Sequence, residues 1–165
     1  MSRTEETRTS RSTAGSTWLR AGAVAVAASA VGNHAVLGVA ELGDASLVVT
    51  DSGTTHDIAA GGIVGVSVVP VVVGIALVAL IALRWIGVVR LAQVVGGAFA
   101  LLSVGGPLAA DTDGGTSVAL AVMHVVTGAA FVAGLELARR RLVAARRADA
   151  SRRAAASDDP RPLAA

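Results

Sequence analysis

The chain has 165 residues, of which 53% are hydrophobic, 16% are charged and only 2% are aromatic, and it contains no cysteine. A soluble domain of this length carries more charge and builds its core with more aromatic side chains. The lack of cysteine excludes disulfides, thiolate metal sites, cysteine nucleophiles and S-acylation. All 14 basic residues are arginines. They lie outside the apolar stretches and are not interleaved with aromatic residues, so we expect no nucleic acid as a partner.

The order of polar and apolar segments predicts a membrane domain. Residues 1–20 are rich in Ser, Thr, Arg and Glu and are predicted to form a disordered tail. Four apolar stretches follow, each near the roughly 20 residues that a helix needs to cross a hydrocarbon core. Only a helix satisfies every backbone group within such a stretch. We therefore predict an all-α bundle of four transmembrane helices within residues 21–138, at 21–40, 61–83, 91–110 and 117–138.

Arginines mark one side of this predicted domain. They occur in the first tail, in the second loop and in the tail 139–165, whereas the first and third loops contain acids and no arginine. This asymmetry predicts a multi-pass protein of the plasma membrane with both termini in the cytoplasm. Most of these arginines are interpreted as topology anchors, and attraction to anionic lipid headgroups is the alternative. The residues concerned are Arg84, Arg90, Arg139, Arg140, Arg141, Arg146 and Arg147.

The first apolar stretch also resembles a signal peptide. Arg20 precedes it, and Ala28-Ser29-Ala30 has the A-x-A form of a cleavage site. The apolar run nevertheless continues to Ala40, and the polar leader is long for a signal peptide. We therefore expect this stretch to be a retained helix.

The segment after the fourth stretch differs from the first tail. Alanine and arginine are strong helix formers, so the fourth helix is predicted to continue through residues 139–157. Acids at helical spacing before the arginines predict ion pairs that join Glu136 to Arg139 and Arg140, and Asp149 to Arg153. Helix caps are predicted at Asp113 or Thr116 before the fourth helix, and at Thr54 to Asp57 before the second.

A few residues inside the apolar stretches need an explanation. Pro70 and Pro107 each predict a helix kink, because proline removes a backbone hydrogen bond. Pairs of small residues predict close helix packing at Gly61/Gly65, Gly96/Ala100 and Ala130/Gly134. The candidate polar layer within the membrane consists of Asn33, His34, Ser67, His124 and Thr127.

His34 and His124 fall at a similar predicted depth, which leaves two interpretations. In the first they form a site, as a proton-responsive pair, a metal or haem ligand pair, or part of a substrate pocket. In the second each is a neutral ring whose hydrogen bond joins helices. Two histidines do not complete a zinc site, and the sequence has no haem attachment motif. We therefore expect no cofactor and no metal.

Several short motifs together resemble a known family. They are Asn33, Val69-Pro70 followed by Gly74, Gly106-Pro107-Leu108, and Ala121-Val122-Met123-His124 followed by Gly134-Leu135. This set resembles the bacterial four-helix membrane family named domain of unknown function 6069, over roughly residues 18–140. The resemblance implies a small integral membrane protein and brings no activity, substrate or cofactor. His34 lies outside the pattern, so His124 is the better site candidate.

These observations favour a structural or accessory membrane protein rather than an enzyme. We expect its helices to pack on glycine and alanine faces, and copies of the chain to associate with one another in the lipid bilayer. The alternative is a small transporter or channel, with Asn33, His34, Ser67 and His124 lining the outer half of the membrane.

Overall fold

In the computed structural model, residues 3–157 are described, with side chains from residue 15 to residue 155. The chain runs in order through α1 (Arg3–Leu42), β1 (Val48–Asp51), β2 (Thr54–Asp57), α2 (Ala60–Ala82), α3 (Val88–Ser103), α4 (Gly105–Ala109) and α5 (Gly114–Ser157). Within this range, four stretches are long and apolar enough to span a membrane, at Gly15–Leu42, Ala60–Ala82, Val88–Ala109 and Gly114–Ala155. The chain is therefore a multi-pass membrane protein by length and composition, as the hydropathy pattern predicted.

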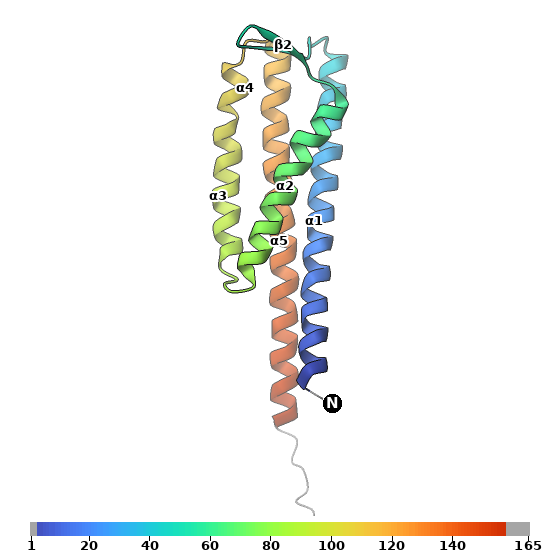
Figure 1. The fold of residues 1–165 in the computed structure, drawn as a ribbon, viewed down its shortest axis with the longest axis vertical. Coiled ribbons are helices and arrows are strands. Elements are labelled where there is room, and N and C mark those ends of the chain that lie inside the picture. The colour runs from blue at the N-terminus through green and yellow to red at the C-terminus, as the bar shows by residue number, and fades with distance from the viewer. Residues whose placement is uncertain (1–2, 158–165) are drawn as a thin grey trace, which may run out of the picture.

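The arrangement of the helices gives the bundle two distinct ends (Figure 1). Helices α1 and α5 run side by side, α2 crosses in front of them, and α3 lies on the other side of α5. We call the end with the two strands the hairpin end. The opposite end carries the beginning of α1, the loop between α2 and α3, and the last part of α5 (Figure 1). The arginines of the described residues belong to these three segments, except Arg90, which lies in the first turn of α3 directly after the loop. We therefore call it the arginine end.

Helix α1 begins earlier than the sequence indicated. It starts at Arg3, so residues 3–20 are helical where a disordered tail was expected. The difference has a local reason: residues 3–20 contain no proline, and extending an existing helix costs less than nucleating a new one.

The third membrane-spanning stretch consists of two helices. Helix α3 ends at Ser103, and α4 begins at Gly105 after a break at Val104. Pro107 follows directly and has no backbone N–H to donate to the carbonyl of Ser103, four residues earlier. The carbonyl of Pro107 itself accepts a hydrogen bond of 2.7 Å from the hydroxyl of Ser117, which joins α4 to α5. Pro70, in contrast, lies inside α2, which is one uninterrupted helix.

The first loop folds into a hairpin that the sequence interpretation missed. Strands β1 and β2 pair antiparallel, with Val48 opposite Asp57 and Asp51 opposite Thr54. Ser52 and Gly53 form the turn with positive φ angles of 50° and 80°, the conformation of tight two-residue hairpins. The prediction that residues 54–57 cap α2 is therefore wrong, because they form β2, and α2 begins at Ala60 with no side-chain cap.

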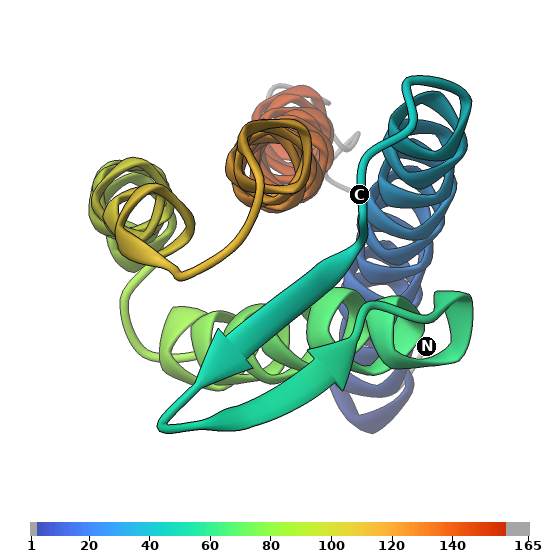
Figure 2. The ribbon, with the colours of Figure 1, turned by 90° about the horizontal axis from the view of Figure 1, so that it is seen from above.

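The hairpin is fastened to the third loop, which precedes α5. The backbone N–H of Thr50 donates to the carbonyl of Asp111 at 3.0 Å, and the hydroxyl of Thr112 donates to the carbonyl of Val48 at 2.5 Å. Figure 2, viewed from above, shows the two strands lying across the end of the bundle. These contacts join loops that are far apart in the sequence.

Candidate functional site

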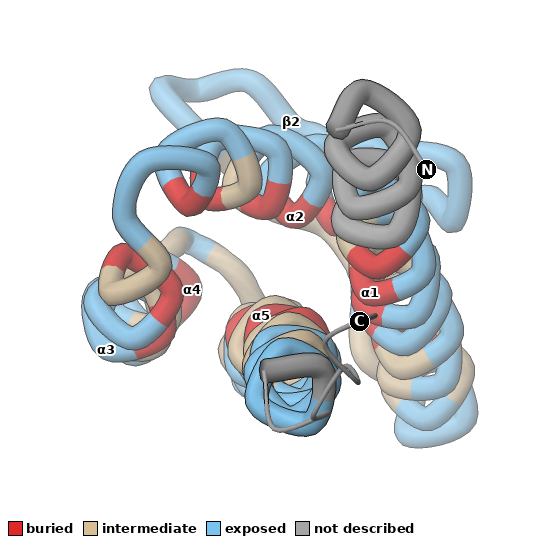
Figure 3. The backbone as a smooth tube through the Cα atoms, turned by 90° about the horizontal axis from the view of Figure 1, so that it is seen from below, coloured by how far each residue is buried: buried red, intermediate tan, exposed pale blue. Residues whose placement is uncertain are grey.

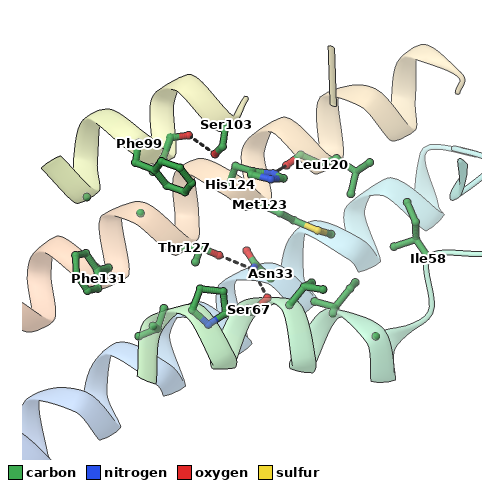
Figure 4. A pocket seen from close by; sticks show the side chains of 18 of the residues that line it. Asn33, Ile58, Ser67, Phe99, Ser103, Leu120, Met123, His124, Thr127 and Phe131 are labelled. Carbon is green, nitrogen blue, oxygen red and sulfur yellow. Dashed lines mark hydrogen bonds between the residues drawn. The ribbon is translucent and has the colours of Figure 1, made fainter. Parts of the chain in front are cut away.

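A cavity between the helices lies toward the hairpin end. Its volume is about 710 Å³, within the range of small-molecule sites. Side chains of α2, α3 and α5 form its walls, Asn33 of α1 contributes from the side, and residues 57–59 line it next to the hairpin (Figure 4). Most of its surface is apolar, with Ile58, Val66, Phe99 and Met123 among the lining residues.

Phe131 of α5 borders the cavity between two glycines on different helices. A Cβ atom built on Gly74 of α2 would lie 2.8 Å from the ring, and one built on Gly96 of α3 would lie 2.5 Å from it. Real Cβ atoms do not approach so closely, so both positions require glycine while the ring stays in place. The aromatic ring therefore fills the space between α2 and α3 at this level.

A cluster of polar side chains joins three helices beside the cavity. Asn33 of α1 donates from Nδ2 to Oγ of Ser67 on α2 at 2.6 Å, and to Oγ1 of Thr127 on α5 at 2.9 Å. Ser29 of α1 donates to the same Thr127 oxygen at 3.2 Å. We call Ser29, Asn33, Ser67 and Thr127 the polar cluster. Figure 4 shows Asn33 between Ser67 and Thr127.

One atom of this cluster is left without a partner. Asn33 is only 2% exposed, and its Oδ1 is the buried side-chain oxygen or nitrogen that lacks a hydrogen bond in the described part of the chain. Burying a polar atom without a partner costs about 1–3 kcal/mol. A ligand in the cavity that donated a hydrogen bond to this oxygen would remove that cost, and this would favour its binding.

The two histidines are placed differently relative to the cavity. His124 lines the cavity and His34 does not. Each ring uses Nδ1 to bond the carbonyl four residues earlier in its own helix, Leu120 for His124 and Ala30 for His34, both at 2.8 Å. The expectation that their hydrogen bonds join helices is therefore not met. Because a carbonyl can only accept, Nδ1 carries the proton in each ring, and Nε2 of a neutral ring is an acceptor.

The other sequence candidates lie in different parts of the bundle. Pro70 borders the cavity, whereas Pro107 lies in α4. Arg84 is exposed in the loop between α2 and α3, and Arg90 is exposed at the start of α3. Arg140, Arg141, Arg146 and Arg147 are exposed along α5, and Arg139 is half-buried.

The predicted ion pairs are largely present on α5. Glu136 pairs with Arg139 and with Arg140, each at 2.7 Å. It also accepts a hydrogen bond from Gln93 of α3 at 3.2 Å. Asp149 pairs with Arg152 rather than with the expected Arg153. Glu136 therefore links α3 to α5 at the arginine end.

Asp113 caps α5 and holds the first loop. Its Oδ1 accepts the backbone N–H of Thr116 at 3.0 Å, which confirms the predicted cap. Its Oδ2 accepts hydrogen bonds from the hydroxyls of Ser46 and Thr116. These bonds stabilise the carboxylate, that of Ser46 most, and hold the pKa of Asp113 well below its usual range.

Two of the three predicted small-residue pairs mediate contacts between helices. A Cβ on Gly134 would lie 2.7 Å from Cβ of Ala25 on α1, and one on Gly128 would lie 2.3 Å from Cβ of Ala100 on α3. Gly61 and Gly65 have nothing within 4 Å of such a Cβ and are exposed. Figure 3 shows exposed backbone on the outer side of α2.

The sequence interpretation overlooked several residues of the cavity. They include Phe99, Met123 and Phe131. Glycines at positions 74 and 96 could have indicated that two helices leave room for a large side chain such as Phe131. Among the side chains described, those of residues 15–155, no group of three or more His, Asp or Glu is placed to hold a metal ion.

Comparison with known proteins identifies a family. The profile of the family of unknown function DUF6069 matches residues 13–141. The match covers more than half of the chain, so the chain belongs to this family, as the short motifs indicated. No curated protein and no solved structure matches the chain.

Proposed function

Taking membership of DUF6069 as the premise, we propose that the chain is a structural or accessory protein of the bacterial plasma membrane. In this proposal both termini lie in the cytoplasm, so the arginine end faces inward and the hairpin end faces outward. The chain performs no catalysis. Its arginines anchor the topology and attract anionic lipid headgroups.

The observation that carries this proposal is how the polar side chains inside the bundle are used. Ser29, Asn33, Ser67 and Thr127 bond mainly to one another, and the two histidine rings bond carbonyls of their own helices. In a membrane such bonds hold helices together. The polar groups are therefore mostly engaged in bundle contacts, which favours a structural role.

A transporter or channel is the second candidate, because Asn33, Ser67 and His124 line the cavity. A channel needs a path lined by suitable polar groups across the bilayer. The Phe131 ring between Gly74 and Gly96 lies in the way of such a path. This obstruction favours the accessory role.

Flux measurements in proteoliposomes separate the two candidates. The proposal predicts that vesicles containing the wild-type chain are no leakier to protons than protein-free vesicles. A pH-dependent flux that is lost in His124→Ala, with the fold intact by circular dichroism, would establish the transporter instead.

We also propose that copies of the chain associate through the exposed side of α2. Gly61 and Gly65 lie one turn apart there, and none of the described helices comes within 4 Å of a Cβ built on either residue. Gly65→Leu is expected to reduce cross-linked dimer in membranes, and an unchanged dimer yield would refute this contact.

A further inference from the structure

We propose that the cavity between α2, α3 and α5 binds an uncharged lipid that carries a hydroxyl head group. The hydrocarbon chain occupies the apolar part of the cavity. The hydroxyl donates a hydrogen bond to a side-chain acceptor of α1 or α5, either Oδ1 of Asn33 or Nε2 of His124. This binding role goes beyond the structural function proposed above.

The setting of the cavity points to a ligand from the bilayer. Val66 of α2 and Phe99 of α3 line it, yet they are 73% and 72% exposed. They therefore mark an opening between two membrane-spanning helices. In a bilayer that opening faces hydrocarbon, so a ligand enters sideways from the lipid phase.

Two polar atoms at the cavity are hydrogen-bond acceptors without a donor. The amide nitrogen of Asn33 donates to Ser67 and to Thr127, whereas its Oδ1 is unpaired. His124 donates from Nδ1 to Leu120, so Nε2 is left as an acceptor. Figure 4 shows both side chains at the cavity, extending from α1 and α5. A hydroxyl is an uncharged lipid group that can donate to either atom.

The charges around the cavity disfavour an anionic head group. No arginine lines it; its charged lining residue is Asp57, exposed next to the hairpin. A phosphate or carboxylate would therefore lose its hydration without gaining a cation. Desolvating a hydroxyl costs much less, and one hydrogen bond offsets most of that cost.

Met123 provides a way for the hydroxyl to reach Asn33. Oδ1 of Asn33 is buried, so a neighbouring side chain must move before a donor can contact it. Met123 of α5 lines the same cavity as Asn33, and Figure 4 shows both side chains. An unbranched methionine changes rotamer at little cost and adapts to the shape of its neighbours.

Photolabelling tests the proposal on the full chain in phosphatidylcholine nanodiscs. The probe is a long-chain alcohol with a diazirine on its chain, and unlabelled hexadecanol and hexadecyl methyl ether are the competitors. We expect mass spectrometry to map the label to cavity-lining residues of α2, α3 and α5. Hexadecanol should compete, and the ether, which has no donor, should need a concentration higher by about threefold or more.

A matched pair of variants tests the position of the site. Gly62 lines the cavity, and a Cβ there would meet nothing within 4 Å, so Gly62→Leu fills space without disturbing the fold. Gly38→Leu places the same side chain where a Cβ also meets nothing within 4 Å, but outside the cavity lining. We expect Gly62→Leu to lose at least about half of the labelling and Gly38→Leu to retain it. Equal labelling of both variants, or equal competition by alcohol and ether, would overturn the proposal.

Discussion

At the arginine end, α1, α2, α3 and α5 meet around one apolar cluster, whereas toward the hairpin end hydrogen bonds link the helices and a cavity remains between them. The cluster consists of Ala25, Val71, Ile75, Val78, Ala82, Val88, Val89 and Leu135. At the hairpin end the buried apolar cluster comprises only Leu37, Ile63 and Met123, and the polar cluster adds hydrogen bonds between the helices.

This difference shows that a membrane bundle is held together both by close packing of small residues and by hydrogen bonds between helices. Lipid is as apolar as a leucine side chain, so burying more apolar surface does not by itself draw helices together. Close packing of small residues does, and at the arginine end Gly134 lies directly against Ala25. At the hairpin end, hydrogen bonds hold the helices while leaving space for a ligand.

Disturbing the close packing should have the largest effect. In Gly134→Ala, the added methyl would lie 2.7 Å from Cβ of Ala25 and 3.2 Å from the backbone oxygen of Ala21. Neither atom can move without moving α1, so we expect a loss of about 1–3 kcal/mol. Unfolding of the purified protein in detergent by sodium dodecyl sulfate measures this loss.

Gly38→Ala is the matched control for that change. Gly38 likewise lies inside a long helix, here α1, but a Cβ there would meet nothing within 4 Å. The substitution should leave stability unchanged or raise it, because alanine favours a helix more than glycine does. Equal losses in the two variants would show that packing against Ala25 is unimportant.

Removing a bond of the polar cluster should cost less. Thr127→Val keeps the shape of the side chain but removes the oxygen that accepts bonds from Ser29 and Asn33. We expect a loss of about 1 kcal/mol in the same unfolding assay, since interhelical hydrogen bonds in membranes contribute about 0.6 kcal/mol on average. In Ser103→Ala, the lost hydroxyl bonds only a carbonyl of its own helix, so this control should stay close to wild type. A loss in Thr127→Val as large as in Gly134→Ala would refute the distinction between the two ends.

His124→Ala should have a smaller effect still. Its ring bonds the carbonyl of Leu120 in its own helix and therefore does not join two helices. A change of about 1 kcal/mol or less is expected in detergent. A substantially larger loss would mean that His124 bonds another helix in the folded protein.

Acid should weaken the loops of the hairpin end. The pKa of Asp113 is lowered in the folded chain by the hydroxyl of Ser46 and then by Thr116, whereas an unfolded Asp titrates near 3.9. The carboxylate therefore stabilises the fold fully above about pH 4, and this contribution is lost as the pH falls further. Melting temperatures between pH 7 and pH 3 should fall more steeply for wild type than for Asp113→Asn. Parallel curves would contradict this role of Asp113.

The sequence predicted the fold better than it predicted the site, for a physical reason. The spans follow from hydropathy, and the cap at Asp113 follows from local spacing. The hairpin was missed although β-branched residues flank Ser52-Gly53, because four apolar stretches favoured an all-helical interpretation. Hydropathy does not reveal how helices rotate and cross. It therefore could not indicate that Asn33 meets Ser67 and Thr127, or that His34 lies away from the cavity.

The measurement that tests the account most directly is the sidedness of the two ends. The chain has no cysteine, so single cysteines can be introduced without a background. Ser52→Cys, at the hairpin turn, should react with a membrane-impermeant maleimide in intact cells. Ser10→Cys and Ser151→Cys should react only after the membrane is permeabilised. Labelling of Ser10→Cys or Ser151→Cys in intact cells, or protection of Ser52→Cys, would contradict a bundle that crosses the membrane four times with its arginine end in the cytoplasm.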